Sequence, residues 1–286
     1  MRPFRGALGL LTLALAFAAW PAESNATITF GSDLSRPVQA FSDTCILSTP
    51  PCTELLVGVH RANSFPAASP TDGVIVSFGI KTSQASNVVF RLGEVPSLNS
   101  GKARGAGTGP GAAVGKGTTS IPAHVPVKAG DFVGVDTSSV AAYSTACETG
   151  GREFTYHPTL AGSLEPSDSN STCELLVNAT VRPSSDFTFK KLKRDEDRGT
   201  AALVLGLPGP GGLVLSGKGI KRVSEHAAEA GNARIRIKPA GKAKRRLRNR
   251  GEATVKAKVE FTPDGGSART KTKLVKLILK SPAKSQ

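Results

Sequence analysis

The sequence predicts an all-β protein, an antiparallel jelly-roll-like sandwich followed by an immunoglobulin-like sandwich. Short runs rich in Val, Ile, Leu and Phe recur along the chain, bounded by Gly, Pro, Ser and Asn. No window of a dozen residues has a convincing helical period of apolar positions. The 286 residues include 31 Gly and 19 Pro, which favours many short elements over long helices.

The first 26 residues have the pattern of a secretory signal peptide. Arg2 and Arg5 form a short positive region, an apolar run follows over residues 8–19, and Ser24-Asn25-Ala26 suits a cleavage site. The apolar run is shorter than the roughly 20 residues that span a bilayer. We therefore expect a mature chain without a transmembrane segment that is secreted or associated with the cell envelope.

Residues 27–182 are expected to form the first sandwich. Val74, Val76, Phe78 and Ile80 are apolar at every second position, which is typical of a strand packed on one side. The predicted strands are Glu54–Val59, Gly73–Lys81, Asn87–Val95, Thr118–Ile121, Asp131–Asp136, Glu153–His157 and Cys173–Val181.

A glycine-rich stretch, residues 101–117, interrupts these strands. It contains no G-x-G-x-x-G, and Gly115-Lys116 is followed by Gly117 where a phosphate-binding loop needs Ser or Thr. We interpret the stretch as a mobile hairpin loop.

The cysteines Cys45, Cys52, Cys147 and Cys173 all lie in this first domain. An even number of cysteines in an exported chain is typical of disulfides. The pairs Cys45–Cys52 and Cys147–Cys173 are the simplest of the three connectivities that four cysteines allow. No C-x-x-C occurs and no histidine stands at ligand spacing from a cysteine, so we expect no metal site.

Residues 183–286 are expected to form the second sandwich, after a polar joint at residues 182–186. Ser224 is a candidate cap for a helical turn after a strand, and Lys242–Arg250 is a candidate basic helical turn that Gly251 ends. The predicted strands are Phe187–Leu192, Thr200–Leu207, Leu213–Ser216, Ala233–Lys238, Ala253–Phe261 and Ala268–Lys280.

Positive charge is concentrated in this second domain. Residues 27–182 hold 10 Lys+Arg and 12 Asp+Glu, whereas residues 183–286 hold 25 and 9, a net charge of +16. Alternation directs Ile235 and Ile237 inward and the neighbouring cations outward. We expect outward cations of two strands and of the helical turn to merge into one polyanion-binding surface. Its expected contacts are Arg234, Arg236, Lys244, Arg245, Arg246, Arg248, Lys256 and Lys258.

The candidate partners are an anionic cell-envelope polymer or another polyanion, such as an acidic polysaccharide, lipid head groups or extracellular nucleic acid. The second domain has no Tyr or Trp, and Phe187, Phe189 and Phe261 are its only aromatic residues. Because single strands are held by stacking on aromatic side chains, we expect no specific nucleic-acid site.

Catalytic motifs are absent from the sequence, and no cofactor is expected. There is no H-E-x-x-H and no G-x-S-x-G. A triad assembled in space from His60 or His157, Asp72 or Asp131, and a serine stays open as an alternative. Asp131 and Asp136 are interpreted as turn and strand-end residues and not as a catalytic pair.

Three passages give the chain a resemblance to uncharacterised exported proteins of high-GC Gram-positive bacteria. They are Thr29-Phe30-Gly31-Ser32-Asp33-Leu34, Pro126-Val127-Lys128-Ala129-Gly130-Asp131 and the Lys/Arg-alternating tail over residues 240–280. The resemblance implies a secreted β-sandwich protein, and it implies no activity and no functional residues.

These observations predict a non-catalytic binding protein of the cell envelope. Its second domain is expected to hold it on an anionic polymer, and its first sandwich to bind an unidentified ligand. An exported hydrolase with its site in the first sandwich and a purely structural envelope protein are the alternatives. The oligomeric state is left open.

Overall fold

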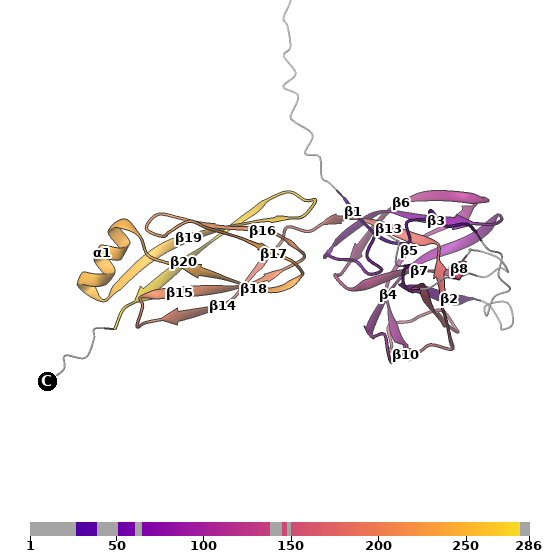
Figure 1. Cartoon of the computed structure of the whole chain (residues 1–286), viewed down its shortest axis with the longest axis horizontal. Helices are drawn as coiled ribbons and strands as arrows, with labels where there is room; N and C mark the ends of the chain where they lie inside the picture. Colours follow the sequence, from indigo (N-terminus) through magenta and orange to yellow (C-terminus); the bar gives the residue numbers. More distant parts are fainter. Residues whose placement is uncertain (1–26, 39–50, 61–64, 138–144, 148–149, 281–286) are drawn as a thin grey trace, which may run out of the picture.

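The computed structural model is almost wholly β-stranded (Figure 1). The residues that it describes are 27–38, 51–60, 65–137, 145–147 and 150–280. Antiparallel sheets and one α-helix make up this part of the chain, which confirms the predicted all-β sandwich class. The single described helix is too short and too polar to cross a membrane. The predicted signal peptide, residues 1–26, lies outside the described residues.

The first unit contains a four-stranded and a seven-stranded sheet. The order β1-β13-β3-β6 joins Ile28–Gly31, Val177–Pro183, Gly73–Thr82 and Gly117–Val127. The order β10-β5-β4-β7-β2-β9-β11 joins Glu165–Pro166, Lys102–Val114, Ser86–Ser97, Asp131–Thr137, Cys52–Gly58, Arg152–Tyr156 and Ser169–Ser171. A small pair joins β8, Thr145–Cys147, to β12, Cys173–Leu175. Phe30, Phe78 and Phe90 are fully buried in its main core. The predicted alternation holds for Phe78 and Ile80, but a β-bulge between Ile75 and Ser77 puts Ile75 in the core and leaves Val74 and Val76 only partly buried.

The second unit contains a three-stranded and a four-stranded sheet with a core of their own. The order β14-β15-β18 joins Thr188–Asp195, Thr200–Leu207 and Gly231–Ile237. The order β17-β16-β19-β20 joins Val223–Ala227, Gly211–Ser216, Glu252–Pro263 and Arg269–Ile278. Helix α1, Gly241–Arg250, lies at the end of this unit away from the first one (Figure 1). Leu203, Ile235 and Val259 are fully buried in the shared core.

The glycine-rich stretch is a strand, so its interpretation as a mobile loop was wrong. Lys102–Val114 form β5 and pair with β4, and only Gly115 and Lys116 separate β5 from β6. A Cβ on Gly109 would lie 2.7 Å from the ring of Phe78 and 2.9 Å from the Cβ of Phe90. The glycine is therefore needed because the strand crosses close to the stacked core aromatics.

In the second unit one predicted local element is wrong and another is confirmed. Val223–Ala227 form β17 paired with β16, so the predicted helical turn capped by Ser224 was wrong. Pairing with the sheet decides these residues, because the short polar segment gains ladder hydrogen bonds as an edge strand. The basic helical turn is confirmed as α1, and Gly251 adopts the left-handed conformation while its N–H donates to the Leu247 carbonyl.

The two units meet at a short backbone contact around Asp72. Its N–H donates to the Pro208 carbonyl at 2.7 Å, and its carbonyl accepts from the Ser184 N–H at 2.8 Å. A Cβ on Gly209 would lie 2.2 Å from the Thr71 hydroxyl oxygen, so the loop that leaves β15 approaches the first unit closely. These bonds restrict the joint between β13 and β14.

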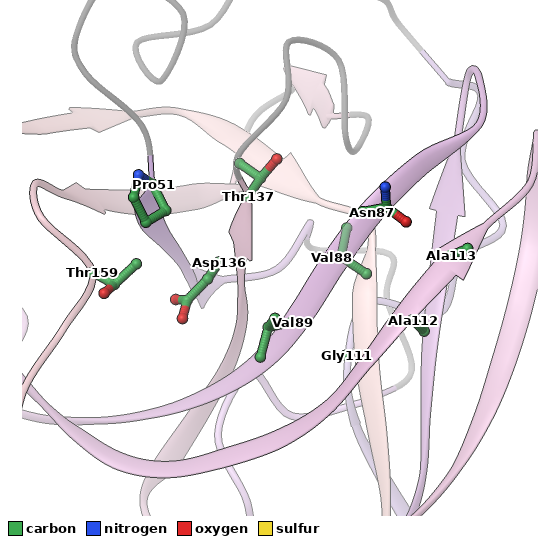
Figure 2. A pocket seen from close by; sticks show the side chains of 10 residues that line it. All are labelled: Pro51, Asn87, Val88, Val89, Gly111, Ala112, Ala113, Asp136, Thr137 and Thr159. Carbon is green, nitrogen blue, oxygen red and sulfur yellow. The ribbon is translucent and has the colours of Figure 1, made fainter.

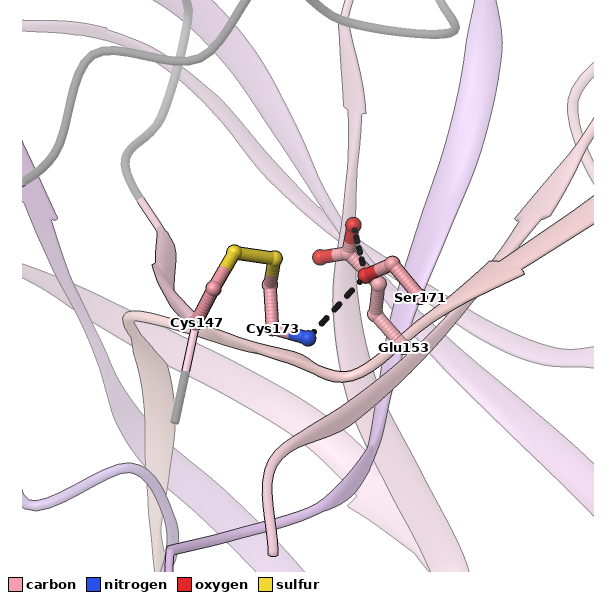
Figure 3. The surroundings of a disulfide bond; sticks show 4 residues. All are labelled: Cys147, Glu153, Ser171 and Cys173. Carbon is pink, nitrogen blue, oxygen red and sulfur yellow. Dashed lines mark hydrogen bonds between the residues drawn. A yellow bond between two sulfur atoms is a disulfide. The ribbon is translucent and has the colours of Figure 1, made fainter. Parts of the chain in front are cut away.

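A disulfide braces the small sheet of the first unit. Cys147 and Cys173 are bonded and face each other in the pairing of β8 with β12 (Figure 3). The Ser171 hydroxyl accepts from the Cys173 N–H at 3.2 Å and donates to Glu153 at 2.9 Å. The predicted Cys147–Cys173 pair is confirmed. Cys52 is also disulfide-bonded, while Cys45 lies outside the described residues.

We expect Gly109→Ala to lower the free energy of unfolding by about 1–3 kcal/mol, because the added methyl group forces the packed Phe78 and Phe90 to move. Urea denaturation measures the change. Gly115→Ala is the matched control, since nothing lies within 4 Å of a Cβ there. An equal effect of both substitutions would contradict the close-crossing explanation.

We expect Cys147→Ala with Cys173→Ala to cost about 3 kcal/mol of stability, because the bond closes a loop across a sequence separation of 26. Denaturation of the double variant and the parent measures this cost. A loss well below 1 kcal/mol would show that the small sheet constrains these residues without the bond.

Candidate polyanion-binding surface

Arg234 and Arg236 stand on β18, at one edge of the three-stranded sheet. Arg234 lies opposite Val204 of β15, and Arg236 lies opposite Ala202. The intervening Ile235 is fully buried in the core. Because alternate residues of a strand face opposite sides, both arginines lie on the outer face of this sheet.

Lys256 and Lys258 stand on β19, in the other sheet of the sandwich. Lys256 lies opposite Leu274 of β20, and Lys258 lies between Ser216 of β16 and Thr272 of β20. The buried residues that alternate with these lysines point into the same core. The lysines therefore lie on the outer face of the four-stranded sheet, on the opposite side of the sandwich from Arg234 and Arg236.

Helix α1 supplies the remaining predicted contacts, Lys244, Arg245, Arg246 and Arg248, and all four are exposed. Leu247 is the buried residue of this helix. Arg246 and Lys256 line a shared cavity of about 660 Å³ together with Lys218, Lys242 and the exposed Leu274. Residues of α1 and β19 therefore line the same cavity.

The eight predicted cations do not form one surface, which corrects the expected merger. The structure brings Arg246 of α1 into the same cavity lining as Lys256, whereas Arg234 and Arg236 belong to the opposite sheet. The physical reason is topological, because β18 and β19 are successive strands that pair in different sheets. Residue alternation gives each strand an outward side, but it does not decide which sheet a strand joins.

None of the eight cations forms an ion pair with another described residue. Other cations of this unit do form ion pairs. Lys276 Nζ lies 2.6 Å from Glu252 Oε2, and Lys271 Nζ lies 2.7 Å from Asp186 Oδ1. The predicted contacts therefore keep their charge available to a partner.

A second group of cations surrounds Arg234 and Arg236 and was missed by the sequence reasoning. Lys193, Arg198 and Lys238 line a cavity of about 250 Å³ with these two arginines. The available signal was the Lys/Arg-rich run over residues 190–194, which pairs with β15 on the side away from β18.

The first unit contains a separate cavity of about 570 Å³ over the seven-stranded sheet. Figure 2 shows Val89, Asp136 and Thr159 around it, with Gly111 and Ala112 of β5 on another side. Asp136 accepts a hydrogen bond from Thr53 at 2.5 Å, and Arg91 pairs with the same carboxylate. This cavity is the candidate ligand site of the first sandwich.

The histidines of the hydrolase alternative are dispersed. His157 Nδ1 lies 3.4 Å from Asp168, and the backbone N–H of His60 donates to Glu174 at 2.7 Å. His124 is exposed on β6. No hydrogen bond joins a histidine ring to a serine hydroxyl within the part of the chain that the structure describes. The described residues assemble no Ser-His-Asp arrangement.

Asp72 and Asp131 instead organise the turn after β6. The Asp131 carboxylate accepts from the Lys128 N–H at 2.8 Å, and Asp72 accepts from the Ala129 N–H at 2.9 Å. Burial raises the pKa of Asp131, and the nearby Glu94 and Asp72 carboxylates act in the same direction. The described residues contain no group of His, Cys, Asp or Glu arranged to hold a metal ion.

No family model matches this chain, and neither does any curated protein. Among solved structures the chain is similar to β-glucuronidase from Ruminococcus gnavus in complex with uronic deoxynojirimycin, at 9% identity and a TM-score of 0.21 over 85% of this chain and 39% of that one. A second similar structure is a complex of a β-glucuronidase from that organism with D-glucuronic acid. Its sequence identity is 10% and its TM-score is 0.23, over 92% of this chain and 47% of that one. The chain spans less than half the length of these structures. At such TM-scores the similarity carries no argument about function.

We expect Asp131→Asn to become more stable relative to the parent as pH rises. A carboxyl whose pKa is raised in the folded state stabilises that state below its ordinary pKa, and this stabilisation is lost as pH rises through the folded value. The asparagine carries no charge to desolvate and still accepts from the Lys128 N–H. Urea denaturation of both proteins from about pH 3.5 to pH 7 measures the difference, since the ordinary value is near 3.9. A difference that does not change with pH would contradict the desolvation of Asp131.

Proposed function

We propose that this protein is a secreted, non-catalytic binding protein of the cell envelope. Its second unit is retained electrostatically on an anionic polymer, and its first sandwich binds an unidentified ligand. The observation that carries the proposal is that the eight predicted cations have no ion-pair partner among the described residues, within a segment of net charge +16.

Physical cost supports the same proposal. Like charges on neighbouring positions repel, and a high net charge destabilises the compact state. Lys242 and Lys244 also lie in the first turn of α1, which has no acidic residue, although the start of a helix favours negative charge. A polyanion that covers these cations relieves the repulsion on binding.

The cavity of the first unit supports its role as the ligand-binding part. Its lining combines apolar groups from Val88, Val89 and Ala112 with polar groups from Asn87 and Thr159. Small-molecule sites commonly combine an apolar lining with a few polar groups that fix orientation. The ion pair of Arg91 with Asp136 links the adjoining strands β4 and β7, and it fixes the position of the Asp136 carboxylate in the cavity lining.

The proposal is tested by sedimenting the mature full-length chain with Gram-positive cell walls across a salt series. We expect retention to fall steeply with salt, because charge contacts are screened over about 8 Å at physiological ionic strength and about 3 Å at 1 M. Replacing Arg234, Arg236, Lys256 and Lys258 with Ser should lower the slope of log binding against log salt, because each lost contact to a flexible polyanion removes about 0.7 from it.

The matched control replaces Lys102, Arg104, Lys116 and Arg182 of the first unit with Ser, which removes the same charge. We expect it to bind nearly as the parent does. Loss of binding in both variants would show that net charge and not the second unit governs retention. Absence of binding by the parent at low salt would overturn the proposal in favour of a purely structural envelope protein.

A further inference from the structure

The three-stranded sheet carries two rows of cations on its outer face. One row runs Lys193, Ala202, Arg236 across β14, β15 and β18, and the next row runs Lys191, Val204, Arg234. The central strand β15 thus has small or apolar side chains where both neighbouring strands have long cations. This arrangement makes a trough along β15, and it is defined here by Lys193, Arg198, Arg234, Arg236 and Lys238 around Thr200 and Ala202.

The exposure of Ala202 shows that the trough has walls. Ala202 is only 3% exposed although it lies on the outer face between Lys193 and Arg236. The long side chains of the flanking strands therefore stand over the floor. The cavity that they enclose has a volume of about 250 Å³.

Charge in the trough is strongly one-sided. Asp195 is the single acidic residue of its lining, and it lies 4.0 Å from Arg198. Lys193, Arg234, Arg236 and Lys238 form no ion pair with another described residue. Arg194 also lines the cavity, but its Nε donates to the Lys276 carbonyl at 2.9 Å, which directs it toward β20.

The geometry points to an extended phosphodiester polymer that lies in this trough along β15. Arg234, Arg236 and Lys238 follow one another at every second residue, an interval of about 6.8 Å along a strand. A linear polymer with a phosphate in each repeat meets successive cations at such an interval. Each guanidinium fork can bind two oxygens of one phosphate.

The size and chemistry of the floor favour a narrow backbone. The trough is smaller than the pockets of about 300–1,000 Å³ that enclose drug-sized ligands. No aromatic residue lines it, so the site has no platform on which a base stacks. The hydroxyl of Thr200 is the polar group of the floor and can donate to a phosphate oxygen.

This inference rests on the proposed polyanion retention and names its site and ligand class. It assigns the ordered contacts to the β14–β15–β18 face. The cations of α1 and β19, on the other sheet, then contribute only to the long-range field. Lys193, Arg198 and Lys238 join Arg234 and Arg236 as contacts.

The test measures binding of a poly(glycerol phosphate) oligomer to the full-length chain across a salt series. Replacing Lys193, Arg234 and Arg236 with Ser should lower the slope of log affinity against log salt by about 2, since each contact to a flexible polyanion contributes about 0.7. The matched control replaces Lys221, Arg222 and Arg250 with Ser, which are exposed cations of the same unit outside both the trough and the eight predicted contacts, and it removes the same charge. We expect its slope to stay near that of the parent.

A charge-neutral variant separates a shaped site from a diffuse field. Ala202→Leu fills the floor without changing net charge, and we expect it to weaken binding of the oligomer at least about tenfold, a change of about 1.4 kcal/mol. Thermal unfolding checks that each variant is folded. If the serine variant does not fold, Arg234→Lys with Arg236→Lys keeps the charge and removes the forks, and it should also weaken binding.

Three results would contradict the inference. If the trough variant and the control lose equal binding and Ala202→Leu has no effect, the assignment of the ligand to the trough is wrong, and the proposed function still stands. Equal or tighter binding of polyglutamate of the same charge would overturn the phosphate assignment. If the parent binds neither poly(glycerol phosphate), nor polyglutamate, nor cell walls at low salt, both this inference and the proposed function are wrong.

Discussion

Burial of Ile235 and Ile237 in the core of the second unit is the constraint on which its charged surface depends. Both side chains are fully buried, and burying a side chain of this size stabilises the fold by about 1.5–3 kcal/mol. The pleat of β18 leaves no other side for Arg234 and Arg236 than the outer face. The core therefore fixes the direction of the cations, and a one-residue slip of the strand would bury charge at a large cost.

The same constraint acts on β19, where Val255 and Val259 are buried and Lys256 and Lys258 are exposed. The two strands follow each other in the chain, with α1 between them, yet they belong to different sheets. The sandwich consequently carries cations on both outer faces. Its core is neutral and apolar, so repulsion among the cations is spread over the surface and moderated by solvent and salt.

The first unit depends on a different kind of packing. Strand β5 crosses the stacked pair Phe78 and Phe90 so closely that Gly109 has no room for a side chain. Farther along the same strand, Gly111 and Ala112 border the cavity beside Asp136. Small residues thus serve both the close crossing and the open space of this cavity. The bonds of Asp72 to Pro208 and Ser184 then join this unit to the charged one.

Local patterns in the sequence determined the all-β class, most strand positions and the outward direction of the cations. Each of these follows from residue alternation and turn residues, which neighbouring residues specify. The pairing of Cys147 with Cys173 was one of three connectivities that the sequence allowed, and the tertiary structure selected it. The strand at Lys102–Val114, the edge strand at Val223–Ala227 and the separation of Arg234 from Lys256 were decided by the tertiary structure alone. Whether a glycine-rich stretch forms a loop or a strand depends on the side chains that pack against it, as Phe78 and Phe90 pack against Gly109. Which cations share a surface depends on which strands pair, and both are long-range contacts that no short sequence window contains.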